Sequence, residues 1–182
     1  MLLNNVSIEW VNNFKYLGVA FIASNNLVVD SSYIKRKFYA ACNAVLAKCK
    51  YVNEIVQLHL VKLFCLPLLT YCIGTLDIPQ YKVKELGVCW NSCFRKIFRN
   101  NTSESVKELQ YFCDQLPFAY IFDLYKWNFL SNPYTGQAQS VDLFVRLNSY
   151  VIDAFKLKYA PSGSSQFCRK RAIHLYVAEH LA

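Results

Sequence analysis

The sequence predicts a mostly α fold that begins with a β-hairpin. Before residue 30, apolar and polar residues alternate one by one, which is the period of a half-buried strand. After residue 30, apolar residues recur at steps of three and four, which is the period of a helix packed on one side. We expect a hairpin over residues 1–29, a helical bundle over 30–130, a linker over 131–140 and a helical segment over 141–182.

The hairpin is predicted from two alternating stretches with a turn pair between them. Val6, Ile8 and Trp10 alternate with polar residues, and a second alternating strand covers residues 14–22. The pair Asn12-Asn13 between them favours a turn, because asparagine tolerates positive φ. An isolated hairpin is marginally stable in water, so we expect it to pack on other elements.

Two capped helices follow the hairpin. The segment Asp30-Ser31-Ser32 offers N-cap oxygens to the first helix, and Asn53 can cap the second. Pro67 kinks or ends the second helix, because proline lacks an N–H and clashes with the preceding turn. Apolar residues occur on all sides of residues 55–73, so we expect this segment to be the most buried helix of the chain. The segment also contains polar side chains and a proline, which disfavour a membrane span.

The middle of the chain contains three more predicted helices. Pro79 suits the first turn of one whose apolar positions are Val83, Leu86, Trp90, Cys93 and Ile97. Ser105 and Glu108 are spaced like a capping box for a short helix, and residues 118–130 form an aromatic-rich helix.

Small polar residues, Pro and Gly mark a boundary at residues 131–140. Beyond it, helical periodicity covers residues 141–159, a loop covers 160–166, and a basic final helix starts near Arg169.

The charge balance favours an anionic partner. The chain has 20 Lys and Arg against 12 Asp and Glu, a formal charge of +8. Nucleic acid and a membrane surface both fit this balance, as does a merely basic protein without such a partner. Charged residues make up 18%, fewer than the roughly 25% of ordinary soluble domains, which suggests a surface partly covered by another domain or a protein.

Six of the eight cysteines form pairs at helical spacing, namely Cys42 with Cys49, Cys65 with Cys72 and Cys89 with Cys93. The N-terminal residues do not have the pattern of a secretory signal. We therefore predict reduced, buried thiols in an intracellular protein, with nucleus and cytoplasm both left open. A zinc site is disfavoured because Cys89 and Cys93 lack a second pair at finger spacing.

Catalytic chemistry is not apparent in the sequence. Nucleotidyl transfer needs carboxylates gathered around two metal ions, and the aspartates here are isolated from one another. Five glycines provide no phosphate-binding loop. We predict that the chain as it stands is not an enzyme and holds no cofactor or metal.

Basic residues on apolar helices suggest binding instead. The two densest groups are Lys35, Arg36 and Lys37, and Arg95, Lys96 and Arg99. Aromatic residues interleave with them, so that cations could neutralise phosphates while rings stack on unpaired bases. A solvated basic face beside a core aromatic stripe explains the same residues equally well.

The order of these features resembles one family. The segment Phe14-Lys15-Tyr16-Leu17-Gly18-Val19 resembles the primer-grip hairpin of LINE-type (non-LTR) retrotransposon reverse transcriptases. The basic helix that follows, the segment Leu66-Pro67-Leu68-Leu69-Thr70-Tyr71 and the segment Cys93-Phe94-Arg95-Lys96-Ile97-Phe98 resemble the thumb of these polymerases. The resemblance covers roughly residues 6–130.

This resemblance implies a primer-grip and thumb-like fragment of an RNA-directed DNA polymerase. It implies that the fragment contacts nucleic acid through Tyr16, Leu17, Gly18, Lys35, Arg36, Lys37, Arg95, Lys96 and Arg99. The family's catalytic aspartates and their Mg²⁺ belong to a palm that precedes the hairpin. We therefore expect a chain that binds an RNA–DNA hybrid or DNA duplex without catalysis, has the missing palm as its structural partner and does not contact membranes.

The alternative is a stand-alone helical protein-interaction module with no role in nucleic-acid binding. In that case the low fraction of charged residues reflects a protein partner.

Overall fold

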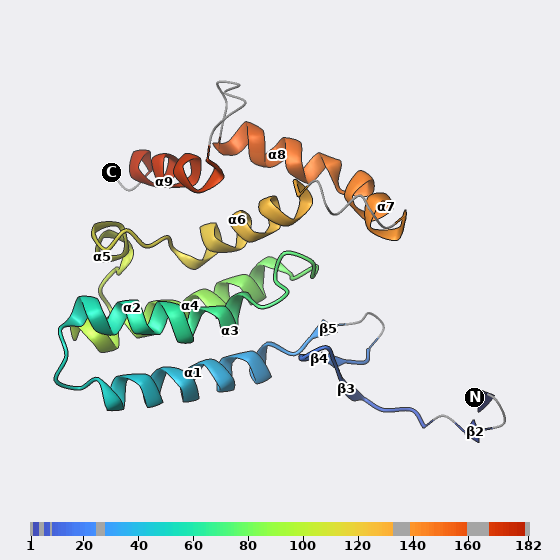
Figure 1. Ribbon diagram of the computed structural model, residues 1–182, viewed down its shortest axis with the longest axis horizontal. Coiled ribbons are helices and arrows are strands. Elements are labelled where there is room, and N and C mark those ends of the chain that lie inside the picture. The colour runs from blue at the N-terminus through green and yellow to red at the C-terminus, as the bar shows by residue number, and fades with distance from the viewer. Residues whose placement is uncertain are drawn as a thin grey trace.

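The computed structural model describes residues 2–3, 6–7, 9–24, 28–132, 139–159 and 168–180. It is mostly helical and has an N-terminal three-stranded antiparallel sheet, which confirms the predicted fold class. The helices form a stack (Figure 1), with α1 (Ser31–Lys48) on one side and α8 (Ser149–Tyr159) and α9 (Arg169–Glu179) on the opposite side. No helix in the described ranges is long and apolar enough to cross a membrane.

Two small sheets lie at the N-terminus. The first pairs β1 (Leu2–Leu3) with β2 (Val6–Ser7). The second has the order β3 (Asn13–Tyr16), β4 (Val19–Ile22) and β5 (Val28–Val29). Both sheets are antiparallel throughout.

The hairpin turn does not lie where the sequence predicted it. The prediction of a turn at Asn12-Asn13 is wrong, because the turn is formed by Leu17 and Gly18. Their φ angles are 45° and 84°, so both residues are left-handed, as a two-residue type I′ hairpin requires. The predicted single strand over residues 14–22 is therefore itself the hairpin.

The second sheet is attached to the helices at β5. The buried Lys82 side chain from α4 (Gln80–Phe98) donates a hydrogen bond to the carbonyl of Val29 in this strand. Phe14 and Phe21 stack across the hairpin with ring centroids 5.3 Å apart. Trp10, which was predicted to lie in a strand, is 88% exposed and lies outside the strands. Ile8, predicted in the same strand, lies outside the described residues.

The helices of the first part of the chain follow the predicted order. They are α1 (Ser31–Lys48), α2 (Glu54–Phe64), α3 (Leu66–Thr70), α4 (Gln80–Phe98) and α5 (Lys107–Phe112).

The predicted N-caps of α1 and α2 are confirmed. The Asp30 carboxylate accepts a hydrogen bond from the backbone N–H of Ser32 at 2.9 Å, and the Asn53 amide oxygen accepts one from Ile55 at 2.8 Å. The predicted capping box before α5 is not formed, because the N-cap residue is Val106 and the Ser105 hydroxyl accepts from the backbone N–H of Lys107, at 3.4 Å, and not from that of Glu108.

The later helices are α6 (Phe118–Leu130), α7 (Gln139–Leu147), α8 (Ser149–Tyr159) and α9 (Arg169–Glu179). The helix predicted over 141–159 is interrupted at Asn148, whose side chain donates to the Phe144 carbonyl at 2.8 Å.

Residues 133–138 of the predicted linker and the predicted loop at 160–166 lie outside the described residues. Within the described residues, α8 and α9 contribute Tyr159, Ala172, Ile173 and Val177 to the same core as the earlier helices. The division of the chain into separate domains stays a prediction.

The core is built around α4. Its five predicted apolar positions are all buried, and Trp90 is completely enclosed while its indole N–H donates to the Leu116 carbonyl at 3.2 Å. The prediction that residues 55–73 are the most buried stretch is wrong. Leu58 and Val61 of α2 are buried, but Leu63 and Phe64 are exposed.

All eight cysteines lie within the described residues and are free thiols. Cys42 and Cys93 meet in the core with their Sγ atoms 3.1 Å apart. Burial raises the pKa of Cys65 to about 11, so this thiol stays protonated at neutral pH. Among the described residues, no group of three or more His, Cys, Asp or Glu could hold a metal ion.

Two glycines provide a matched test of how closely α6 packs on the rest of the bundle. A Cβ at Gly74 would lie 2.9 Å from the Tyr125 carbonyl oxygen and 3.0 Å from the Phe129 Cβ. We expect Gly74→Ala to lower the free energy of unfolding by about 1–3 kcal/mol through overpacking. Urea unfolding followed by tryptophan fluorescence measures this loss.

The control is Gly87→Ala within α4, where a Cβ would be 3.6 Å from that of Phe118. Alanine is the better helix former by about 1 kcal/mol, so this change should leave stability equal or raise it. Equal destabilisation by both substitutions would contradict the packing of α6 against Gly74.

Candidate nucleic-acid interface

The surface predicted to bind nucleic acid begins where the hairpin meets α1. Tyr33 and Lys37 are four residues apart on α1 and therefore share one face of the helix. The Lys37 Nζ lies 4.7 Å from the centroid of the Tyr33 ring, and the Lys15 Nζ from β3 lies 5.5 Å from it. The ammonium groups of Lys37 and Lys15 lower the pKa of Tyr33. Two cations from separate elements are thus gathered around one half-buried ring.

The turn between β3 and β4 is fixed against the helices by Tyr71, which directly follows α3. The Tyr71 hydroxyl donates a hydrogen bond to the Leu17 carbonyl oxygen at 3.0 Å. A Cβ at Gly18 would lie 3.4 Å from the Tyr71 ring, and the φ of +84° there also disfavours other residues. Gly18, Tyr33, Lys37 and Tyr71 line a cavity of about 340 Å³ between the turn and the helices. The primer-grip-like turn is therefore held beside the basic face of α1.

Lys35 faces α4 and is already paired. Its Nζ lies 2.9 Å from the Glu85 Oε2, and the Ser31 hydroxyl donates to the same oxygen at 3.2 Å. Lys35 holds the pKa of Glu85 below its usual value, so this carboxylate stays ionised. Consecutive helical residues point about 100° apart, which leaves Arg36 and Lys37 exposed to solvent.

Lys96 extends the basic surface to the C-terminal part of α4. Because α1 and α4 run in parallel, Lys96 lies level with Asn43, and its Nζ donates to the Asn43 Oδ1 at 2.8 Å. The same ammonium lies 5.7 Å from the centroid of the Tyr39 ring. Arg36 and Tyr39 also line an open groove between α1 and α4.

The other two cations predicted on α4 point elsewhere or lie beyond the helix. Arg95 donates from Nη2 to the Glu104 carbonyl at 3.2 Å, which turns it toward the loop before α5. Arg99 is exposed in a left-handed conformation, with φ of 57°, at the C-cap of α4. The structure therefore brings Lys96, and not Arg95, against α1.

We call the surface formed by Lys15, Tyr33, Arg36, Lys37, Tyr39 and Lys96 the α1 face. Tyr16 and Leu17 lie beside it on the hairpin and are both exposed. Lys15, Tyr33 and Tyr39 of the α1 face, and Tyr71 that anchors the turn, were not predicted as site residues. Lys15 and Tyr71 lie in the family-like segments, but the contact of Tyr71 with Leu17 spans 54 residues and leaves no local pattern.

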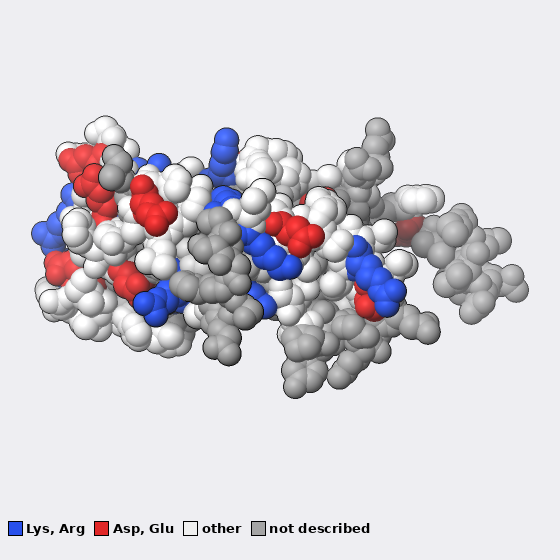
Figure 2. All heavy atoms as spheres, turned by 90° about the horizontal axis from the view of Figure 1, so that it is seen from above, with Lys and Arg blue, Asp and Glu red and all other residues white. Residues whose placement is uncertain are grey.

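The opposite side of the molecule has a different charge distribution. Figure 2 shows acidic and basic side chains interspersed over the C-terminal helices, with no continuous basic band among the coloured atoms. Ion pairs on these helices include Arg146 with Asp142 at 2.7 Å and Lys158 with Asp123 at 3.0 Å. Because these charges already neutralise one another, this side of the molecule does not favour binding of a polyanion such as nucleic acid.

No protein-family model, curated protein or solved structure matches the chain. The assignment of a function therefore depends on the geometry of the α1 face and on the resemblance of the hairpin.

The hydrogen bond of Tyr71 can be removed alone. We expect Tyr71→Phe to weaken the attachment of the turn by about 1 kcal/mol, the usual net contribution of one hydrogen bond. Native-state hydrogen exchange should show faster exchange in β3 and β4 and unchanged exchange in α4. Tyr51→Phe, on a 94% exposed ring, is the control and should leave the hairpin amides unchanged. Equal exchange in both variants would contradict the anchoring role of Tyr71.

Proposed function

We propose that this chain is the primer-grip and thumb-like part of a LINE-type reverse transcriptase and binds an RNA–DNA hybrid or DNA duplex without catalysis. The observation that carries this proposal is the α1 face, where Lys15 of β3 and Lys37 of α1 lie over the Tyr33 ring beside the hairpin turn, and Lys96 of α4 lies over the Tyr39 ring further along α1. The isolated aspartates of the sequence argue against catalysis by this chain.

The α1 face suits contact with a phosphate backbone. Helix α1 has 18 residues and is therefore about 27 Å long. Arg36, Lys37 and Lys96 are exposed along this surface, and the nearby Glu85 is already paired with Lys35. Contacts from such cations position a duplex without reading its sequence.

Exposed apolar side chains on and just before the hairpin support a neighbouring domain. Leu17 in the turn is 71% exposed, Tyr16 in β3 is 64% exposed, and Trp10, in the segment before β3, is 88% exposed. Large exposed apolar side chains in one part of the chain favour coverage by another domain. A palm domain, which would also supply the Mg²⁺ ligands, is the neighbour that the resemblance implies.

The test is a salt titration of binding to a hybrid duplex and to a DNA duplex. The affinity should fall steeply between about 50 and 200 mM salt, because each neutralised phosphate releases a counterion. The variant Arg36→Ala/Lys37→Ala/Lys96→Ala should bind more weakly and reduce the slope of log K against log salt by about 0.9 for each cation that contacts a phosphate. Fluorescence anisotropy with labelled duplex measures both effects.

The control is Lys156→Ala on α8, whose ammonium pairs with Asp153 at 3.2 Å on another side of the stack. Its slope should equal that of the unmodified chain. The proposal fails if the unmodified chain does not bind either duplex at low salt, or if the triple variant, shown to be folded by circular dichroism, keeps the full slope.

A second candidate function, a protein-interaction module, is favoured by the exposed apolar side of α2. Exposed apolar side chains there are Ile55, Val56, Leu63 and Phe64. This second function would replace the first if the folded chain binds neither duplex but forms a defined complex with a purified protein. The double variant Leu63→Lys/Phe64→Lys should then disrupt that complex. If the double variant still forms the complex, the exposed apolar side of α2 is not the interaction surface.

A further inference from the structure

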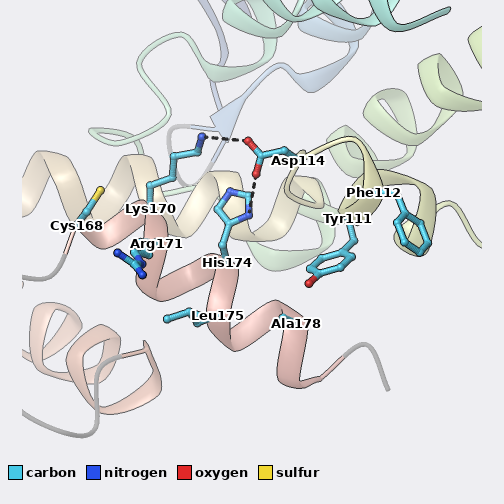
Figure 3. Close-up of a pocket in the computed structure, with 9 residues that line it drawn as sticks. All are labelled: Tyr111, Phe112, Asp114, Cys168, Lys170, Arg171, His174, Leu175 and Ala178. Carbon is cyan, nitrogen blue, oxygen red and sulfur yellow. Dashed lines mark ion pairs between the residues drawn. The ribbon is translucent and has the colours of Figure 1, made fainter.

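A second cluster of cations and aromatic rings lies between α5 and α9, away from the α1 face. It surrounds an open pocket of about 600 Å³ (Figure 3), within the range of ligand sites. Tyr111 and Phe112 project from α5, whereas Lys170, Arg171 and His174 come from α9. Neither the hairpin nor α1 contributes to the lining described for this pocket.

The two rings are available for stacking. Phe112 is 82% exposed and Tyr111 is also exposed. Their ring centroids are 6.0 Å apart and their planes meet at 69°, so they present two differently oriented surfaces beside the pocket. Exposed aromatic rings of this kind can each accept an unstacked base.

Charged and polar groups lie on the other side of the pocket. Lys170 and His174 turn toward Asp114, with the Lys170 Nζ 3.8 Å and the His174 Nδ1 3.6 Å from its carboxylate oxygens. Arg171 is exposed and has no ion pair among the described residues. One carboxylate against two permanent cations leaves the pocket positive.

His174 lines the pocket with an uncharged ring. Burial lowers the pKa of His174, and Lys170 and Lys62 act in the same direction against the opposing effect of Asp114. The ring is therefore neutral at pH 7. Its Nε2 atom is buried and finds no hydrogen-bond partner in the described part of the chain.

We propose that the pocket between α5 and α9 binds an unpaired strand of nucleic acid, with a base stacked on Phe112 and phosphates held by Lys170 and Arg171. An unpaired strand fits better than a duplex, because the faces of paired bases are hidden within the stack. The two cations of the pocket also limit the electrostatic contribution to about two phosphates. This site goes beyond the duplex binding proposed for the α1 face, and α1 and α9 lie on opposite sides of the helical stack (Figure 1).

The test uses labelled uridine and deoxythymidine oligomers of about ten nucleotides, a length that covers one such site. We expect Phe112→Ala to weaken binding of the oligomers about 5- to 100-fold, the usual effect of losing one stacking ring. Lys170→Ala/Arg171→Ala should reduce the salt slope by about 1.4, or 0.7 for each cation. Both variants should keep the duplex affinity of the unmodified chain.

Phe64→Ala is the matched control, because Phe64 is an exposed ring on α2 outside the pocket. It should bind the oligomers as the unmodified chain does. Comparison of the uridine and deoxythymidine oligomers decides whether RNA or DNA is preferred, and binding of either supports the site.

Cys168 provides an independent footprint of occupancy. It is exposed, lines the pocket, and has a pKa lowered by the backbone N–H groups of Arg171 and Lys170. Alkylation of Cys168 by iodoacetamide, located by mass spectrometry, should slow when the oligomer is bound and should not slow in Phe112→Ala.

Unchanged alkylation on binding, equal losses in Phe112→Ala and Phe64→Ala, or no binding of either oligomer would overturn the site. If the unmodified chain binds the duplexes but neither oligomer, only the pocket is rejected. If it binds the oligomers but neither duplex, only the proposed function of the α1 face is rejected.

Discussion

The parallel packing of α1 against α4 is the constraint on which the rest of the structure depends. It is held near the start of α1 by Lys35 and Glu85, and about two turns further along by the contact of Cys42 with Cys93 and the hydrogen bond of Lys96 to Asn43. Small thiol side chains at the centre let the helices approach closely, and α2 and α6 then pack on α4 as well. The same packing determines which cations face solvent together, since it brings Lys96 level with α1.

The helices could be predicted because their signals are local. Asp30 and Asn53 lie at the starts of α1 and α2, and the apolar positions of α4 recur with the period of a buried face. The hairpin turn could not, because alternation continued through Leu17 and Gly18 and resembled one unbroken strand. Leucine rarely adopts positive φ, so the Asn12-Asn13 pair was the stronger turn signal. A two-residue turn also changes which face of the sheet each later residue occupies. Val19 pairs with Tyr16 across the hairpin and lies on its face, whereas in one continuous strand Val19 would share the face of Lys15.

Burial of α2 was overestimated for a different physical reason. An all-round apolar sequence indicates the preference of the side chains, whereas burial depends on how many neighbours surround the helix. Helix α2 packs on α1, α3 and α4, and Leu63 and Phe64 still remain uncovered. No neighbour covers them among the residues that the structure describes. This exposed apolar surface, together with the low charge fraction of the sequence, is what favours the second candidate function, a protein-interaction module.

The candidate site shows the same limit of sequence reasoning. Three consecutive cations, Lys35, Arg36 and Lys37, suggest one basic patch, but successive residues on a helix point in different directions. Lys35 is neutralised by Glu85, which lies 50 residues away in sequence, whereas Lys37 turns to Tyr33. The positive surface is consequently assembled from residues on three elements and only partly from the obvious run. Because it lies across the helical stack from the pocket between α5 and α9, a duplex and an unpaired strand would not compete for the same cations. Affinities for the two ligands should then change independently when either surface is mutated.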